Sequence, residues 1–359
     1  MFNYIKLPTN MIDQIKSFLD RNALALAMLI GVIGFPLFRH LTGMLPPLIF
    51  LMLFFTFCKI NPMDLRLRMW HIVVLITQLA LGISIYYAIM SFGSRLFDSS
   101  FKDIAIIAQG LMLCVLMPTA SAAAIIAGKL GGSIQNLTSF TLLSNVATAI
   151  IVPLFFPVVN PSAGIEFGAA FWMILRRITP LLICPFLAAW LLRIAYNTYH
   201  RRRATGRTFA LPLRWASIPF YVWVITLVIL MADLTYSLIH QHYSYWTIGI
   251  LCVGSLITCL MQFALGRLIG TYFPAATKGE DYHDILINPD AAHYTMEQVS
   301  RITAGQAFGQ KNTTLAIWMA QAYLLPIASM APAAYIIWQN LFNSIQLSRA
   351  GKLANKKGA

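Results

Sequence analysis

The chain has 359 residues, of which 58% are hydrophobic and only 11% charged, and it carries a formal net charge of +14. Soluble domains contain roughly 25% charged residues, so the composition excludes a soluble protein and indicates a polytopic membrane protein. With about 20 residues for each span and short loops between spans, there is room for roughly ten helices and for no sizeable soluble domain.

Membrane topology explains the positive charge better than a nucleic-acid partner does. The basic run at residues 200–203 lies in a short loop between apolar segments, with no aromatic platform or recognisable binding module beside it. We therefore expect membrane lipids, and no nucleic acid, as partners. The five cysteines have no paired ligand spacing, which indicates packing residues rather than a metal site or disulfides.

Apolar runs predict an all-α fold of about ten transmembrane helices. In chain order these runs lie near residues 22–39, 43–59, 69–91, 104–128, 136–157, 176–197, 214–238, 246–272, 303–324 and 327–346. Residues 165–175 are predicted to form a short interfacial helix before the sixth span. The predicted organisation is a cytoplasmic N-terminal segment (1–21), two five-span repeats (22–159 and 160–347) and a basic cytoplasmic tail (348–359).

Lysine and arginine residues determine the predicted orientation. With both termini on one face, that face receives twenty of the 26 basic residues and the opposite face receives five. Such an excess marks the cytoplasmic side, so we expect both termini in the cytoplasm. The one basic residue that falls on neither face is Lys311.

Two polar stretches interrupt the fourth and ninth predicted spans. Residues 117–121 contain proline and hydroxyl groups, and residues 309–314 contain glycine, amides, hydroxyls and Lys311. Non-helical backbone at membrane depth persists only inside protein or beside water. Paired interruptions in two halves of a chain are typical of the binding site of a secondary transporter. Because five is an odd number of spans, the second repeat is inverted, and the two broken helices are expected to cross.

These features resemble the bile acid:sodium symporter superfamily, in its bacterial branch, over residues 22–347, and the resemblance implies a bacterial inner membrane as the location of the spans. The resemblance rests on short motifs in a fixed order: residues 45–48 and 61–64, Gln78, residues 119–121, residues 309–313 and residues 338–340. It implies a ten-span fold with a panel domain of spans 1, 2, 6 and 7 and a core domain of spans 3–5 and 8–10. It also implies uptake of organic anions, including amphipathic ones, by an elevator-like or rocking movement of the core against the panel.

The chain departs from the family pattern where the family binds sodium. The resemblance places a bridging glutamate, a glutamine and an asparagine at positions that are here Ala307, Lys311 and Ala122. A protonated lysine would repel sodium from the volume it occupies. We therefore expect Lys311 to replace a sodium ion, and the transport of a small organic anion to be sodium-independent or proton-coupled.

The candidate substrate- and ion-binding residues lie in the two interruptions and in the third and fifth spans. They are Gln78, Thr119, Ser121, Thr138, Thr141, Ser144, Asn145, Gln310, Lys311, Asn312 and Thr313. Of these, Gln78, Ser121, Gln310 and Asn312 mark a degenerate sodium site. No other metal or cofactor is expected.

Several alternatives stay open at this level. Lys311 could be structural, with its ammonium neutralising the negative ends of the broken helices. The chain could also be a sodium-coupled symporter that uses the remaining ligands, or a non-transporting sensor or channel. An enzyme is disfavoured, because the spans contain no paired carboxylates, His-Glu-x-x-His helix or nucleophile triad. The sequence does not predict the substrate or the oligomeric state.

Overall fold

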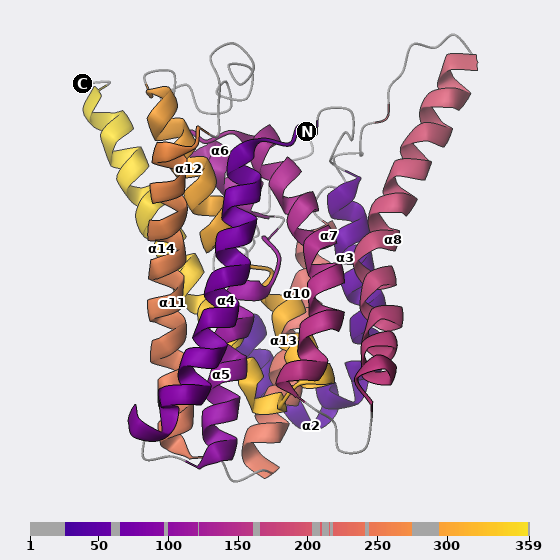
Figure 1. Cartoon of the computed structure of the whole chain (residues 1–359). Coiled ribbons are helices and arrows are strands. Elements are labelled where there is room, and N and C mark those ends of the chain that lie inside the picture. Colours follow the sequence, from indigo (N-terminus) through magenta and orange to yellow (C-terminus); the bar gives the residue numbers. More distant parts are fainter. Residues whose placement is uncertain are drawn as a thin grey trace, which may run out of the picture.

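The computed structural model describes residues 26–58, 65–96, 100–120, 122–160, 166–202, 209, 215, 218–240, 244–274 and 294–357 (Figure 1). This part of the chain consists of helices, their connections and one isolated β-bridge. The all-α prediction is confirmed. Ser121, one of the candidate site residues, lies outside the described residues.

One group of helices comes from the start of each half of the chain. Residues 26–33 are helical and are followed by α2 (Phe35–Phe38), the 3-10 helix η1 (Arg39–Met44) and α3 (Leu45–Phe57). These elements pack with α8 (Phe167–Arg202) and α10 (Ile218–His240): α3 contacts both of them, and α2 contacts α10. In Figure 1, α3 and α8 lie side by side at the right of the molecule.

The predicted interfacial helix at residues 165–175 is wrong. A single helix, α8, runs without a break from Phe167 to Arg202. Nothing between Phe167 and Pro180 terminates it, and it continues through Pro180 and Pro185. Prolines are tolerated inside membrane helices because neighbouring groups satisfy the freed backbone atoms.

The second group of helices contains the two interrupted segments. Its members are α4 (Met69–Leu96), α5 (Phe101–Leu116), α6 (Ala122–Lys129), α7 (Ile134–Val159), α11 (Tyr245–Tyr272), α12 (Met296–Gly309), α13 (Thr313–Tyr323), the 3-10 helix η5 (Pro326–Ser329) and α14 (Met330–Lys357). Side chains of Ser100, Ser133, Thr295 and Asn312 cap the N-termini of α5, α7, α12 and α13. Each cap satisfies a backbone N–H that has no partner within its helix.

Glycines allow α11 and α12 to pack at close range. A Cβ atom on Gly266 would lie 2.5 Å from the Ala304 carbonyl oxygen, and one on Gly270 would lie 2.4 Å from the Ser300 carbonyl oxygen. On α12, a Cβ on Gly309 would strike the Phe263 ring at 2.4 Å. Such close contact between small residues is typical of helix pairs in membranes. It holds the C-terminal end of α12 in place.

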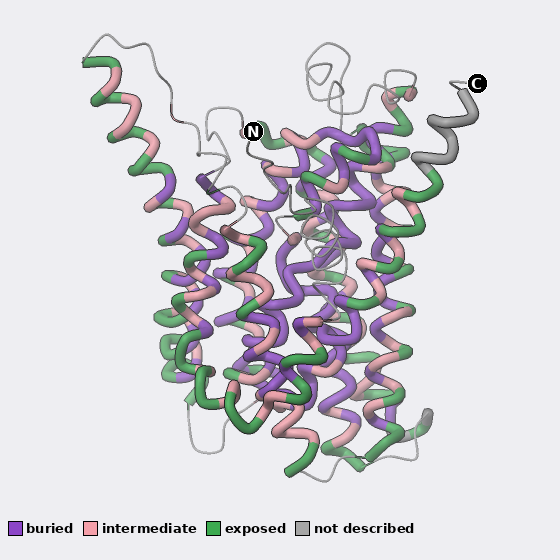
Figure 2. The backbone as a smooth tube through the Cα atoms, turned by 180° about the vertical axis from the view of Figure 1, so that it is seen from behind, coloured by how far each residue is buried: buried purple, intermediate pink, exposed green. Residues whose placement is uncertain are grey.

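Six helical stretches of the described residues are long and apolar enough to cross a membrane. They are Phe35–Phe57, Met69–Gly93, Ile134–Val159, Phe167–Arg202, Ile218–His240 and Tyr245–Tyr272. Figure 2 shows buried residues concentrated in the middle of the bundle and exposed ones at its periphery. Many exposed side chains are large and apolar, including Ile76, Leu191 and Ile257. A hydrocarbon environment suits such a surface, and the chain is a multi-pass membrane protein.

Candidate functional site

The two polar stretches meet each other inside the bundle. α5 ends at Leu116 before the first stretch, and α12 ends at Gly309 before the second. Thr119 and Lys311 form an antiparallel β-bridge between the stretches. The Ala120 N–H donates to the Gln310 carbonyl (3.0 Å), and the Asn312 N–H donates to the Pro118 carbonyl (2.8 Å). Backbone N–H and carbonyl groups of one stretch thus pair with those of the other, as buried backbone groups require. We call residues 117–120 and 310–312 the crossing.

The two bridge residues are held in the same way. The Thr119 N–H donates to the Ser144 hydroxyl oxygen of α7 at 2.8 Å. The Lys311 N–H donates to Oε1 of Gln339 on α14 at 3.0 Å. In each half, a side-chain oxygen of a later long helix, α7 or α14, accepts the backbone N–H of the bridge residue.

The last carbonyls of α5 accept hydrogen bonds from α4. A helix leaves its final carbonyl groups without partners in the helix. Gln78 Nε2 donates to the Leu116 carbonyl at 2.9 Å and to the Met117 carbonyl at 3.1 Å. Gln78 Oε1 is buried and has no hydrogen-bond partner. Gln78 therefore caps the C-terminus of α5 with its side-chain nitrogen, and its side-chain oxygen is left without a hydrogen-bond donor.

The last carbonyls of α12 are also occupied by neutral donors. Thr119 Oγ1 donates to the Ala307 carbonyl at 2.7 Å. The Tyr335 hydroxyl of α14 donates to the Gly309 carbonyl at 2.8 Å. These bonds tie the end of α12 to both halves of the chain without any charged group.

Lys311 is the basic residue of the crossing, and its side-chain nitrogen has no hydrogen-bond partner. The residue is 1% exposed, and Nζ has no hydrogen-bond partner. Nζ lies 5.1 Å from the centroid of the Phe308 ring, which is a cation–π distance. The alternative in which this ammonium neutralises the helix carbonyl ends finds no hydrogen bond in its favour: Gln78, Thr119 and Tyr335 donate to those carbonyls, and Nζ donates to none of them.

The α7 candidates differ in how they relate to the crossing. Ser144 contacts Thr119, and the neighbouring Asn145 carries a buried Oδ1 without a partner. Thr141 donates to the Leu137 carbonyl of its own helix, and Thr138 is only partly buried. Ser144 therefore supports the crossing directly, whereas the Thr141 hydroxyl is used within α7.

The remaining candidates surround Lys311 in the chain. Gln310 Nε2 donates to Gln306 Oε1 at 2.6 Å, and so turns toward α12 rather than toward the other stretch. The Asn312 side chain caps α13 by accepting from the Leu315 N–H at 3.2 Å. Thr313 is buried at the start of α13.

Two α14 residues support the crossing although they are not among the sequence candidates. Gln339 accepts from Lys311, and Tyr335 donates to Gly309 and accepts from Gln262 Nε2 at 3.0 Å. Gln339 belongs to the short motif at residues 338–340, so a sequence signal for it exists. Tyr335 carries no such signal, because a tyrosine in an apolar run is an ordinary packing residue.

A comparison with protein families gives the evolutionary context of this site. A sequence model described as "Sodium Bile acid symporter family" matches residues 46–238, which is more than half of the chain. The chain belongs to this family. The matched segment includes Gln78, Thr119, Ser144 and Asn145 and ends before Lys311. A search of curated proteins finds no match to the chain. Sodium bile acid symporters are transporters, and coupling to sodium is general among them.

The crossing fits the family's sodium ion only in part. Sodium prefers several oxygen ligands, and Gln78 Oε1 and Asn145 Oδ1 are buried oxygens with no other partner. Lys311 Nζ is also buried in the crossing, and an amine that carries a proton would repel a sodium ion beside it. No group of three or more His, Cys, Asp or Glu side chains that could hold a metal occurs among the residues described by the structure.

Proposed function

We propose that this chain is a secondary active transporter of a small or amphipathic organic anion that works without sodium. Membership of the family and six membrane-length apolar helices support transport. The excess of lysine and arginine on one face supports an orientation with both termini in the cytoplasm, as in a bacterial inner membrane.

We further propose ten spans in two inverted five-span repeats, with α5–α6 and α12–α13 as the broken fourth and ninth spans. The equivalent bonds of Thr119 to Ser144 and of Lys311 to Gln339 support this internal symmetry. The contacts among α2, α3, α8 and α10 support a panel domain, and those among α4, α5, α11, α12 and α14 support a core domain. Transport by movement of one domain against the other follows from the family resemblance.

The observation that carries the sodium-free mechanism is the buried, unpaired Nζ of Lys311. Burial of an isolated ammonium is costly in a low-dielectric interior. An incoming carboxylate or sulfonate supplies the missing negative charge, and loss of the Lys311 proton removes the cost in the empty carrier. Anion binding and proton uptake at Nζ are thereby linked, and Lys311 performs the charge compensation that sodium performs elsewhere in the family.

Transport into proteoliposomes tests this proposal. A panel of organic anions, bile acids included, is first screened by thermal shift with and without sodium. Uptake of the best ligand is then measured in sodium chloride and in choline chloride at equal ionic strength. We expect equal initial rates in the two salts, and saturable counterflow, which separates a carrier from a channel or sensor. A steep sodium dependence would overturn the proposal.

One observation favours a second candidate, a sodium-coupled symporter. Gln78 Oε1 and Asn145 Oδ1 are buried acceptors without partners, and such oxygens suit a cation. This candidate predicts that Asn145→Leu reduces sodium-dependent uptake, whereas the sodium-free mechanism predicts no change in the ratio of uptake in sodium to uptake in choline.

A further inference from the structure

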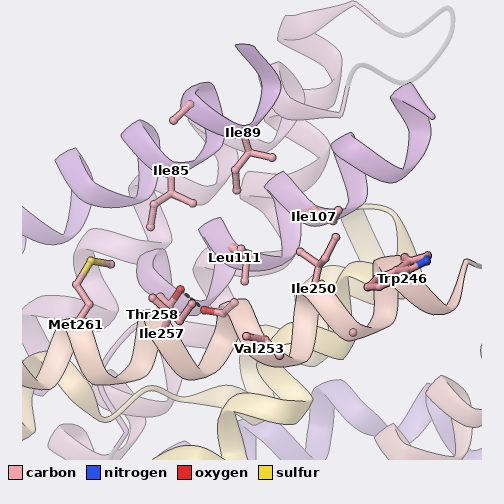
Figure 3. Close-up of a pocket in the computed structure, with 13 residues that line it drawn as sticks. Ile85, Ile89, Ile107, Leu111, Trp246, Ile250, Val253, Ile257, Thr258 and Met261 are labelled. Atoms are coloured by element: carbon pink, nitrogen blue, oxygen red, sulfur yellow. Dashed lines mark hydrogen bonds between the residues drawn. The ribbon is translucent and has the colours of Figure 1, made fainter. Parts of the chain in front are cut away.

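An apolar groove separate from the crossing lies between α4, α5 and α11 (Figure 3). Its volume is about 670 Å³. Ile85 and Ile89 of α4 form one wall, Ile250 and Ile257 of α11 form the other, and Leu111 of α5 lies between them. The crossing uses none of these side chains.

Apart from the indole N–H of Trp246 at one end, the groove offers almost no polar group to hold water. Its single hydroxyl, on Thr258, donates to the Gly254 carbonyl at 2.7 Å, so its proton is used within α11. A water molecule needs two to four polar partners, and cavities that lack them stay dry or take up hydrocarbon. The occupant is therefore apolar.

The groove is open on the periphery of the bundle. Val253 is 57% exposed and Ile257 is 60% exposed, so one side of the groove faces the membrane. Trp246 at one end and Met261 at the other are fifteen residues apart on α11, which is about 22 Å of helix. One leaflet contributes about 15 Å of hydrocarbon, so the groove is long enough for a whole acyl chain.

The Trp246 end has the chemistry of a headgroup region. Trp246 is 79% exposed and Tyr245 is 91% exposed, and such aromatic side chains gather at membrane interfaces. Arg95 lies in the last turn of α4 and Lys102 in the first turn of α5, and both are exposed basic residues at this end of the groove. Asp103 lies beside them, with its carboxylate accepting from Ser100 and Thr247.

Small residues keep the groove open. Gly249 lines it, and a Cβ built on this glycine meets no atom within 4 Å. Ala88 lines the opposite wall and is exposed. Larger side chains at these positions would fill the groove from either side without displacing backbone.

From this geometry we infer that the groove is a binding site for one acyl chain of a membrane phospholipid, with its headgroup at the Trp246 end. The apolar walls, the length and the basic, aromatic rim all match that ligand. A symmetric dimer through this face would set the groove of one copy against the groove of the other. Two concave surfaces would not fill each other, so a lipid chain suits the groove better than a second copy does.

Photolabelling with a phospholipid that carries a diazirine in its acyl chain tests the site. The full chain is reconstituted in vesicles of phosphatidylethanolamine and phosphatidylglycerol, and labelled peptides are mapped. We expect labelling concentrated on α4 and α11. Gly249→Leu and Ala88→Leu should each reduce it by at least about fivefold, which corresponds to about 1 kcal/mol of binding free energy. Gly168→Leu, at an exposed α8 glycine with equally open surroundings, should leave it unchanged.

Three outcomes would overturn the inference. Labelling spread evenly over all exposed helices would mean that the groove has no preference for lipid. Dimers cross-linked through Val253→Cys, together with weak labelling of α11, would mean that a second copy covers it. Displacement of the label by a bile acid would make it a substrate site. Loss of labelling in Gly249→Leu with uptake unchanged would separate this site from the proposed transport function.

Discussion

Thr119 and Lys311 face each other across an antiparallel bridge, although 192 positions separate them in the chain. Ser144 accepts the N–H of Thr119, and Gln339 accepts the N–H of Lys311. The backbone N–H groups of the two residues are therefore bonded in equivalent ways, but their side chains differ. Thr119 donates its hydroxyl proton to a carbonyl, whereas Lys311 brings a buried amine that bonds to nothing.

Replacing Lys311 separates a functional lysine from a structural one. We expect Lys311→Met to keep or raise the melting temperature, because the buried Nζ has no hydrogen bond to lose and an apolar side chain removes the cost of burying an unpaired polar group. The same variant should lose transport of organic anions. Lys129→Met, at an exposed position, is the control and should change neither property by much. A lower melting temperature for Lys311→Met would mean that the lysine holds the crossing together.

The hydroxyl of Thr119 should matter more than that of Thr141. Thr119→Val removes the donor to the Ala307 carbonyl across the two halves, and a buried carbonyl left unpaired costs about 1–3 kcal/mol. Thr141→Val removes only a second bond to a carbonyl within α7. Chemical denaturation of the two variants provides the comparison. Equal loss of unfolding free energy in the two variants would show that the bond between Thr119 and Ala307 contributes no more stability than a bond within α7.

Close packing of α11 on α12 predicts opposite effects for two glycines of one helix. Gly266→Ala places a Cβ 2.5 Å from the backbone oxygen of Ala304, which cannot move aside as a side chain can, and overpacking of this kind costs about 1–3 kcal/mol. Gly249→Ala meets open space and should gain up to about 1 kcal/mol in helix propensity. The two melting temperatures should move in opposite directions. A stable Gly266→Ala protein would contradict the packing of the two helices.

The sequence predicts the helical class and the positions of both interruptions, because composition and polar residues inside apolar runs are local signals. It also singles out Thr119, Ser144 and Lys311, which the structure brings together. It does not predict that Tyr335 and Gln78 satisfy the helix ends, since hydrogen bonds between distant helices leave no local pattern. For the same reason it left open the alternative in which the Lys311 ammonium neutralises those carbonyls. The groove beside α11 was also missed, because a glycine in an apolar helix is an ordinary packing residue.

Dependence of thermal stability on sodium tests the central claim most directly, since it requires no substrate. The melting temperature of the wild-type chain is titrated with sodium chloride against choline chloride at equal ionic strength. A bound ion at ten times its dissociation constant would add about 1.4 kcal/mol of stability. We predict identical curves for the wild type. Ala307→Glu combined with Lys311→Gln restores the family's residue types and is predicted to gain stability only in sodium. A saturable rise of the wild-type melting temperature in sodium would contradict the replacement of the ion by Lys311.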